Sequence, residues 1–302
     1  MGSSSRTFAL VSGCFAALGW GLTGTFVKLL PHFTTLEVLA LRLVVAVLVT
    51  LPILVINQSL RIQFLRLIQT RIGLGLSSLM VFYYWFAVRA FQLAPVSDVV
   101  LIVGLSPLIG LAMKVVLRKP VAIREGVGAF TAFFGLVLFV LPKLQGTGDR
   151  STYLTGLFFA LLSACVSLGY VSWFKHSASQ NSSLNPVAVA FTTFLLGSIV
   201  IAPIAVVSSP DWMSHLGTTN AGWIALGLGT LSTVVPTLCY SYAAKHLSPI
   251  LTTTLNLLTP IFAAIVAVLL LKEPFPLLSL MGAVLIITGI LLLSSPQPGT
   301  NR

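Results

Sequence analysis

The sequence predicts an all-α polytopic membrane protein, with about ten transmembrane helices arranged as two inverted five-helix repeats. Hydrophobic residues make up 57% of the 302 positions and charged residues only 8%, whereas soluble domains carry roughly 25% charged residues. Apolar runs of about 20 residues, the length that crosses a bilayer, recur along the chain. The chain also repeats itself, and the loops of the two copies differ in charge. The composition and the apolar runs exclude a soluble globular protein, and the repeat with its loop charges predicts the inverted arrangement.

The predicted spans are continuous apolar runs rather than short segments of alternating character, which excludes a transmembrane β-barrel. They cover residues 8–30, 36–56, 72–92, 96–117, 123–142, 152–175, 186–207, 220–244, 249–271 and 277–294. The first run is longer than the hydrophobic region of a signal peptide and lacks a convincing cleavage site, so we expect a retained span.

The internal repeat is clearest between residues 94–141 and 248–293. Matched residues lie 154 positions apart by subtraction: Pro95 with Pro249, Pro120 with Pro274, Gly128 with Gly282, and Gly135 with Gly289. Each copy consists of two apolar segments joined by a short charged turn, LRKP in the first and LKEP in the second. A duplication of the whole chain follows, with residues 1–145 as the first five-helix repeat and 146–302 as the second.

The loop charges predict the orientation. With the N-terminus inside, eleven Lys and Arg residues fall on the inner side and five on the outer side, and Arg42 within a span completes the 17. Basic residues collect in cytoplasmic loops, so both termini are expected in the cytoplasm, with a bacterial inner membrane as the default. Five spans per copy is an odd number, which inverts the second copy. The linker 57–71 carries three Arg and its counterpart 208–219 no basic residue, as inversion requires. Inverted repeats are typical of secondary transporters.

Uncharged polar side chains form stripes at i, i+4 and i+7, the spacing of one helix face. The stripes are Ser163, Ser167 and Tyr170 in the sixth span, Thr233, Thr237 and Tyr240 in the eighth, and Thr252, Asn256 and Thr259 in the ninth. Each stripe alone fits interhelical hydrogen bonding equally well. Together with helix breaks at Pro107, Pro236 and Pro260, which membranes tolerate beside protein or a water-filled cavity, they favour a polar central cavity.

Glu37, Arg42 and Asp98 are ionisable residues at or inside the predicted membrane boundary. Such groups are expensive in lipid and usually face a cavity or a partner. Arg42 therefore either contacts a solute or proton path, or ties helices together through buried carbonyls. Proton coupling needs a titratable group in the pathway, and Glu37 and Asp98 are its acidic candidates. Tyr84 lies at mid-span, where a cavity wall and plain packing fit equally well.

The layout resembles the drug/metabolite transporter superfamily, specifically the EamA-type transporters. The strongest match is LLLKEPFPLLSLMGAVLIITGILLL (269–293), preceded by Thr259-Pro260; the first half matches more loosely through LALRLVVAV, Ser106-Pro107 and GVGAFTAFFGLVL. One departure is Lys119, which stands where the turn of the second half has Glu273. The resemblance implies a central cavity and alternating access by rocking of the two halves. We expect the substrate site to comprise Trp20, Tyr84, Ser106, Ser167, Tyr170, Thr237, Tyr240, Asn256 and Thr259.

The predicted function is secondary transport of a small metabolite, such as an amino acid or related compound, with efflux implied by the resemblance. An antiporter of phosphorylated solutes is the alternative, but Lys28, Arg89, Lys175 and Lys245 lie near span ends, where such side chains reach the headgroups. A membrane enzyme is a third possibility, disfavoured because the four His residues form no cluster with carboxylates. No cofactor, metal or nucleic acid is expected. The expected partners are the solute and the bilayer, and both a monomer and a homodimer remain open.

Overall fold

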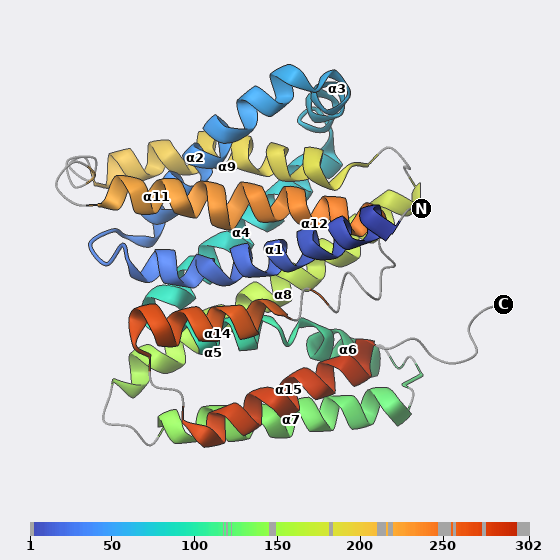
Figure 1. The fold of residues 1–302 in the computed structure, drawn as a ribbon, viewed down its shortest axis with the longest axis vertical. Helices are drawn as coiled ribbons and strands as arrows, with labels where there is room; N and C mark the ends of the chain where they lie inside the picture. Colours follow the sequence, from blue (N-terminus) through green and yellow to red (C-terminus); the bar gives the residue numbers. More distant parts are fainter. Residues whose placement is uncertain are drawn as a thin grey trace.

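The computed structural model is a bundle of long helices (Figure 1). It describes residues 3–116, 118, 120–121, 123–144, 149–180, 184–209, 216, 220–246, 255, 258–273 and 276–294. Within these ranges the regular structure is helical and no strand occurs. The predicted all-helical fold class is therefore confirmed.

The helix bounds follow the predicted spans closely. The first half of the chain forms α1 (Ser3–Lys28), α2 (Thr35–Ile56), α3 (Gln58–Leu67), α4 (Arg71–Leu93), α5 (Val96–Val103), α6 (Ser106–Val116) and α7 (Ile123–Leu144). The second half forms α8 (Arg150–Gln180), α9 (Pro186–Ser208), α11 (Ala221–Gly229), the π-helical turn η2 (Thr230–Val234), α12 (Val235–His246), α14 (Leu258–Leu271) and α15 (Leu277–Ser294).

Seven helices of the described part are long and apolar enough to cross a membrane. They correspond to α1, α2, α4, the α5–α6 pair, α8, α9, and the α11–η2–α12 segment, while α14 and α15 provide shorter apolar helices. Large apolar side chains cover the outside of the bundle: Ile56 is 85% exposed and Ile123 is 88% exposed. Exposing so large an apolar surface to water is unfavourable, so we infer that lipid covers it.

Two of the predicted helix breaks occur in the described chain. The span 96–117 is divided between α5 and α6 at Gly104–Leu105, just before Pro107. The span 220–244 contains η2, which ends two residues before Pro236. Single π-helical turns within α-helices are frequent at functional sites.

The structure corrects one prediction, because part of the linker 57–71 is the helix α3. The Asn57 side chain caps it by accepting a hydrogen bond from the Leu60 N–H at 3.0 Å. Leu60, Phe64 and Leu67 are buried, and α3 packs against α9. The spacing of these three residues is the i, i+4, i+7 signal of an amphipathic helix, masked in the sequence by the Arg and Gln residues between them.

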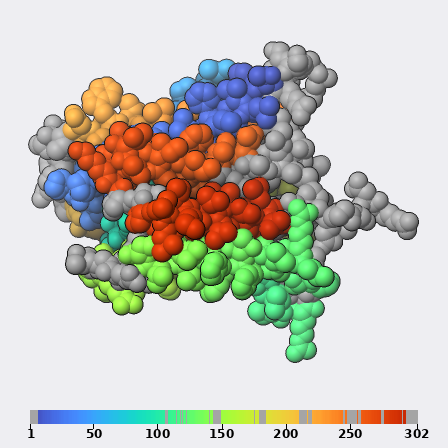
Figure 2. All heavy atoms as spheres, turned by 60° about the horizontal axis from the view of Figure 1, so that its bottom comes forward, coloured from blue at the N-terminus to red at the C-terminus, as the bar shows by residue number. Residues whose placement is uncertain are grey.

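α7 and α15 pack along one another and lie side by side in Figure 2. Their backbones approach closely at the glycines. A Cβ atom on Gly282 would lie 2.6 Å from the carbonyl oxygen of Gly135, and one on Gly289 would lie 2.5 Å from that of Gly128. Glycine is therefore required at Gly282 and Gly289. Because Gly128 matches Gly282 and Gly135 matches Gly289 in the repeat, these are equivalent contacts with the roles of the copies exchanged.

The same offset recurs in the backbone and in the helix contacts. Arg118 and Lys272, 154 residues apart by subtraction, both have a left-handed backbone, with φ of 52° and 54°. They follow α6 and α14, so the corresponding helices end in similar turns. α1 packs against α12 and α14, while α8 packs against α4 and α6, their counterparts at the repeat offset.

Candidate functional site

Arg42 of α2 lies at the centre of a polar and aromatic cluster inside the bundle. Its side chain is 3% exposed. The Nε atom donates a hydrogen bond to Thr233 Oγ1 at 2.8 Å, and Cζ lies 4.2 Å from the centroid of the Tyr84 ring. Cation–π contacts of this length are favourable, most of all where water is excluded. We call Arg42, Tyr84 and Thr233 the Arg42 cluster; it joins α2 and α4 to η2.

The local backbone positions Thr233 for this contact. Its hydroxyl donates to the carbonyl of Leu228, five residues earlier, at 2.7 Å, so the oxygen is oriented to accept from Arg42. Close packing of α11 on α2 holds the two together: a Cβ on Gly229 would lie 3.2 Å from the Arg42 carbonyl oxygen. The π-helical turn and this glycine thus bring a residue of the second half against the buried guanidinium.

Several predicted site residues lie in or beside the cluster. Tyr84 belongs to it, and Tyr170 packs in the same buried assembly of side chains. Thr237, one turn from Thr233, donates its hydroxyl to the Thr233 carbonyl at 2.7 Å. Trp20 of α1 and Tyr240 of α12 lie together, with ring centroids 5.1 Å apart. The aromatic residues of the predicted site thus form two groups, one beside Arg42 and one where α1 packs against α12.

For the remaining residues of the predicted site, the structure shows only the position on a helix or no side chain. Ser167 is half-buried on α8. Thr259 is half-buried in the first turn of α14, where its carbonyl oxygen would lie 3.2 Å from a Cβ on Gly21. Ser106 begins α6, but its side chain lies outside the described part, as does all of Asn256.

Asp98 forms a second polar group, away from Arg42, at the start of α5. Its carboxylate is fully buried and accepts from the Ser97 hydroxyl and from the Tyr153 hydroxyl of α8, each at 2.9 Å. Glu273, in the turn after α14, accepts from the Val96 N–H at 2.8 Å. We call Ser97, Asp98, Tyr153 and Glu273 the Asp98 network.

Glu273 serves as the missing cap of α5. Pro95, at the cap position, makes no side-chain hydrogen bond. The carboxylate of Glu273 reaches the Val96 and Ser97 N–H groups, at 2.8 and 3.5 Å, where the helix dipole favours a negative charge. The sequence alone identifies Glu273 only as part of a turn. The signal for its capping role is the start of α5, where Pro95 occupies the cap position and cannot supply a side-chain acceptor. Lys28 of α1 lies within electrostatic reach of Glu273 and Asp98.

Replacing Glu273 with alanine should lower the free energy of unfolding by about 1–2 kcal/mol, because two N–H groups of α5 lose their acceptor. Glu273→Gln keeps an acceptor oxygen and should lose less than half as much. Chemical unfolding in detergent measures both. Equal stability of the alanine variant and the parent would show that the cap contributes nothing.

Glu37 is engaged at the start of α2. Its carboxylate accepts from the Thr34 N–H at 2.8 Å, and the Thr34 hydroxyl accepts from the Glu37 N–H at 3.4 Å. This reciprocal pair is a capping box, which fixes a helix start. The local geometry thus gives Glu37 a structural task, while its predicted coupling role stays a prediction, as does that of Asp98.

A cavity of about 720 Å³ opens where α1 and α4 end and α2 begins. Lys28 and the exposed Arg89 line it together with Trp85 and Gln92. Gln92 is already engaged, accepting from the Thr35 hydroxyl at 2.6 Å and donating to the Phe33 carbonyl at 3.0 Å. The cavity thus has a basic wall at the end of the bundle.

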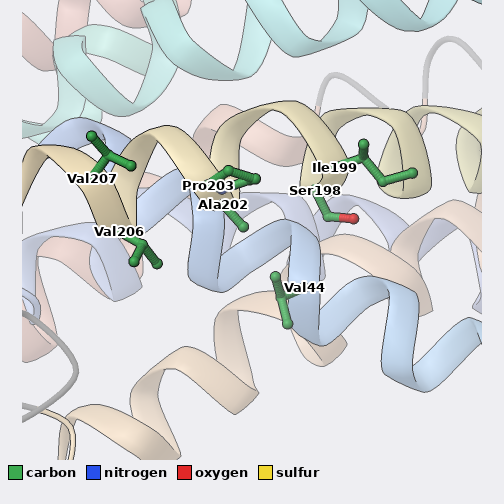
Figure 3. A pocket seen from close by; sticks show the side chains of 7 residues that line it. All are labelled: Val44, Ser198, Ile199, Ala202, Pro203, Val206 and Val207. Carbon is green, nitrogen blue, oxygen red and sulfur yellow. The ribbon is translucent and has the colours of Figure 1, made fainter. Parts of the chain in front are cut away.

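A second hollow, of about 510 Å³, lies between α2 and α9 (Figure 3). Apolar side chains and one serine line it: Val44, Ser198, Ile199, Ala202, Pro203, Val206 and Val207. It does not include the Arg42 cluster. Its apolar, exposed lining fits a lipid chain.

Relatives of the chain include two proteins of Archaeoglobus fulgidus, each described as an uncharacterized transporter. One is 24% identical over 205 residues, covering 68% of this chain and 69% of the relative. The other is 23% identical over 275 residues, covering 90% of this chain and 93% of the relative. A crystal structure aligns with a TM-score of 0.64 at 15% identity, covering 95% of this chain and 97% of that one, and so shares the fold.

The model of the EamA-like transporter family matches the chain twice, over residues 7–141 and 154–295. Together these segments span nearly the whole chain. With the apolar helices, this match identifies an integral membrane transporter rather than an enzyme. The chain belongs to the EamA-like transporter family.

Proposed function

We propose that the protein is a secondary transporter that moves a small metabolite by alternating access between two inverted five-helix repeats, residues 1–145 and 146–302. The double family match supports the division. So do the exchanged glycine contacts between α7 and α15 and the matched turns at Arg118 and Lys272. An inverted pair of repeats gives two similar arrangements, one open to each side of the membrane.

The observation that carries the transport proposal is the Arg42 cluster. Arg42 and Tyr84 belong to the first repeat and Thr233 to the second, so the buried charge lies where the repeats meet. A solute bound there would contact both repeats and respond to their relative motion. Ionisable groups within the membrane typically mark substrate or ion pathways.

The Asp98 network is the proposed gate at one end of the path. It links α5 of the first repeat to Tyr153 and Glu273 of the second. Breaking these hydrogen bonds would let the repeats separate at that end. We assign this end to the outside, because α3, with Arg61 and Arg66, lies at the end of the bundle where α1 begins (Figure 1). Both termini are then cytoplasmic.

The proposed substrate is an amino acid or related compound, and the proposed direction is efflux. One observation favours phosphorylated solutes instead: Lys28 and Arg89 line the same cavity. However, Lys28 lies within reach of two carboxylates, which offset its charge. The Arg42 cluster contains one cation among aromatic and hydroxyl groups, which suits a less charged solute.

Uptake into proteoliposomes tests the proposal. Purified protein is reconstituted, and radiolabelled amino acids and sugar phosphates are screened by counterflow from preloaded vesicles. We expect saturable uptake of at least one amino acid and none of the sugar phosphates. Folded, reconstituted protein that carries no member of the panel saturably would overturn the proposed function.

A further inference from the structure

Arg42 is a buried cation with no anionic partner among the residues that the structure describes. The acidic residues in the described ranges are Glu37, Asp98, Glu125, Asp149 and Glu273. None of them forms an ion pair with Arg42; its side chain interacts with the Thr233 hydroxyl and with the side chains of Tyr84 and Tyr83. Burying a charge without a counter-charge is strongly unfavourable in a protein interior. Such a charge needs a reason beyond stability.

Most of the N–H donors of the Arg42 guanidinium have no acceptor among the described residues. A guanidinium carries five N–H donors, and one of them, on Nε, is taken up by Thr233. The fully enclosed side-chain atoms that lack a partner among the described residues are Thr25 Oγ1 and Gln63 Oε1. The Arg42 nitrogens are not among them, and the hydrogen bond of the side chain to the described residues is the one from Nε, so the Nη N–H groups are left without a partner among these residues.

We propose that Arg42 binds the carboxylate of the transported solute through its two Nη atoms, which deepens the proposed transport function and rests on it. The planar guanidinium presents paired N–H groups that match the two oxygens of a carboxylate. Arg42 Cζ lies over the Tyr84 ring and Nε donates to Thr233. Neither contact uses the hydrogen-bond donors of the Nη atoms, which the proposal assigns to the ligand.

The residues around Arg42 favour a ligand with one negative charge over a ligand with two. Neither Tyr84 nor Thr233 adds a positive charge, and a phosphate dianion would bring about two negative charges to one cation. The rest of the solute is expected to be apolar or aromatic. Tyr240, which contacts Trp20, is seven residues from Thr233, about 10 Å along a helix. A small aromatic or aliphatic acid spans this distance.

Matched acid and amide probes test the proposal, because they differ in charge and little in shape. Binding of phenylacetate, phenylacetamide, L-phenylalanine, L-phenylalaninamide and phenyl phosphate is measured on purified protein by ligand-induced thermal stabilisation and by inhibition of counterflow. We expect at least one acid to bind about 10–100-fold more tightly than its amide, as a charge-assisted pair predicts. Phenyl phosphate should bind no better than the amides.

Arg42→Met keeps the length of the side chain and removes its charge. It should lower the acid's affinity about 10–100-fold, to that of the amide or below, and lower the amide's affinity much less, because a neutral carbonyl oxygen accepts a weaker hydrogen bond from a guanidinium than a carboxylate does. Arg89→Gln, which removes an exposed cation, is the matched control and should keep the wild-type preference within about twofold. If Arg42→Met fails to fold, Thr233→Val serves instead, because it keeps the charge and frees Nε. It should weaken acid binding by about three- to tenfold and weaken amide binding less, because the acid depends more on the position of the charged guanidinium.

Wild-type protein that binds neither member of any pair, or binds acid and amide equally, overturns the proposal. A preference for the acid over the amide that survives in Arg42→Met also overturns it. If Arg42→Met does not fold, an unaltered preference for the acid in Thr233→Val overturns it instead. Preference for phenyl phosphate would replace the carboxylate by a phosphate. These failures are distinct from failure of the transport proposal: saturable counterflow with no effect of Arg42 leaves the transporter standing and removes Arg42 from its site.

Discussion

Gly282→Val should lower the free energy of unfolding by about 3 kcal/mol, the upper end of the range for overpacking. A Cβ at this position would lie 2.5 Å from the Phe139 nitrogen and 2.6 Å from the Gly135 carbonyl oxygen. Both are backbone atoms, so no side-chain rotation relieves the clash. α7 and α15 must move apart, and the interface that holds these two helices together is lost. Chemical unfolding in detergent, followed by circular dichroism, measures the change.

Gly126→Val is the matched control, since Gly126 lies in α7, the partner helix of α15, but has no atom within 4 Å of the added Cβ. It should change the unfolding free energy by about 0.5 kcal/mol or less, as surface substitutions usually do. Similar losses in both variants would show that helix propensity, rather than the backbone contact, governs the effect.

Asp98→Asn should abolish proton coupling while leaving solute exchange intact. Asparagine keeps one acceptor oxygen for Ser97 or Tyr153, and its NH2 group can donate to the other hydroxyl, but it can neither take up nor release a proton. In the wild type, a one-unit pH gradient should drive about tenfold accumulation for each proton coupled. In the variant, accumulation should fall to the level without a gradient. Uptake into proteoliposomes with an imposed gradient measures the difference.

Tyr153→Phe separates loss of the proton site from loss of the network, because it removes one hydrogen bond and keeps the carboxylate. This variant should still respond to the gradient. A gradient response that persists in Asp98→Asn would reduce Asp98 to a structural residue, and wild-type uptake indifferent to the gradient would indicate a uniporter or exchanger.

The spans were predictable because lipid imposes a simple rule of length and apolar character on each helix. The prediction of a span over 36–56 coincides with α2, and that over 186–207 with α9. The helix α3 was not predicted, because half of its residues are polar and its buried apolar face consists of only three residues. Short amphipathic helices are recognised by their contacts more than by their composition.

The candidate site was predictable in part. The stripe through Thr233, Thr237 and Tyr240 is visible in one helix, and Arg42 is conspicuous within a span. What joins them is the Arg42–Thr233 hydrogen bond, across 191 residues of sequence. Glu273 was missed for the same reason, since its partners in α5 lie 176 and 177 residues away. Partnerships at such separations arise from the packing of the repeats and leave no local pattern.

Single-cysteine labelling tests alternating access most directly. Cys14, Cys165 and Cys239 are replaced by alanine, and Thr237→Cys is introduced beside the Arg42 cluster. A charged, membrane-impermeant thiol reagent is added to one side or the other of oriented vesicles, with Ile199→Cys on the apolar outer surface as the control. We predict that Thr237→Cys reacts from both sides and Ile199→Cys from neither. Reaction of Thr237→Cys from one side only, whether or not solute and a pH gradient are present, would contradict alternating access.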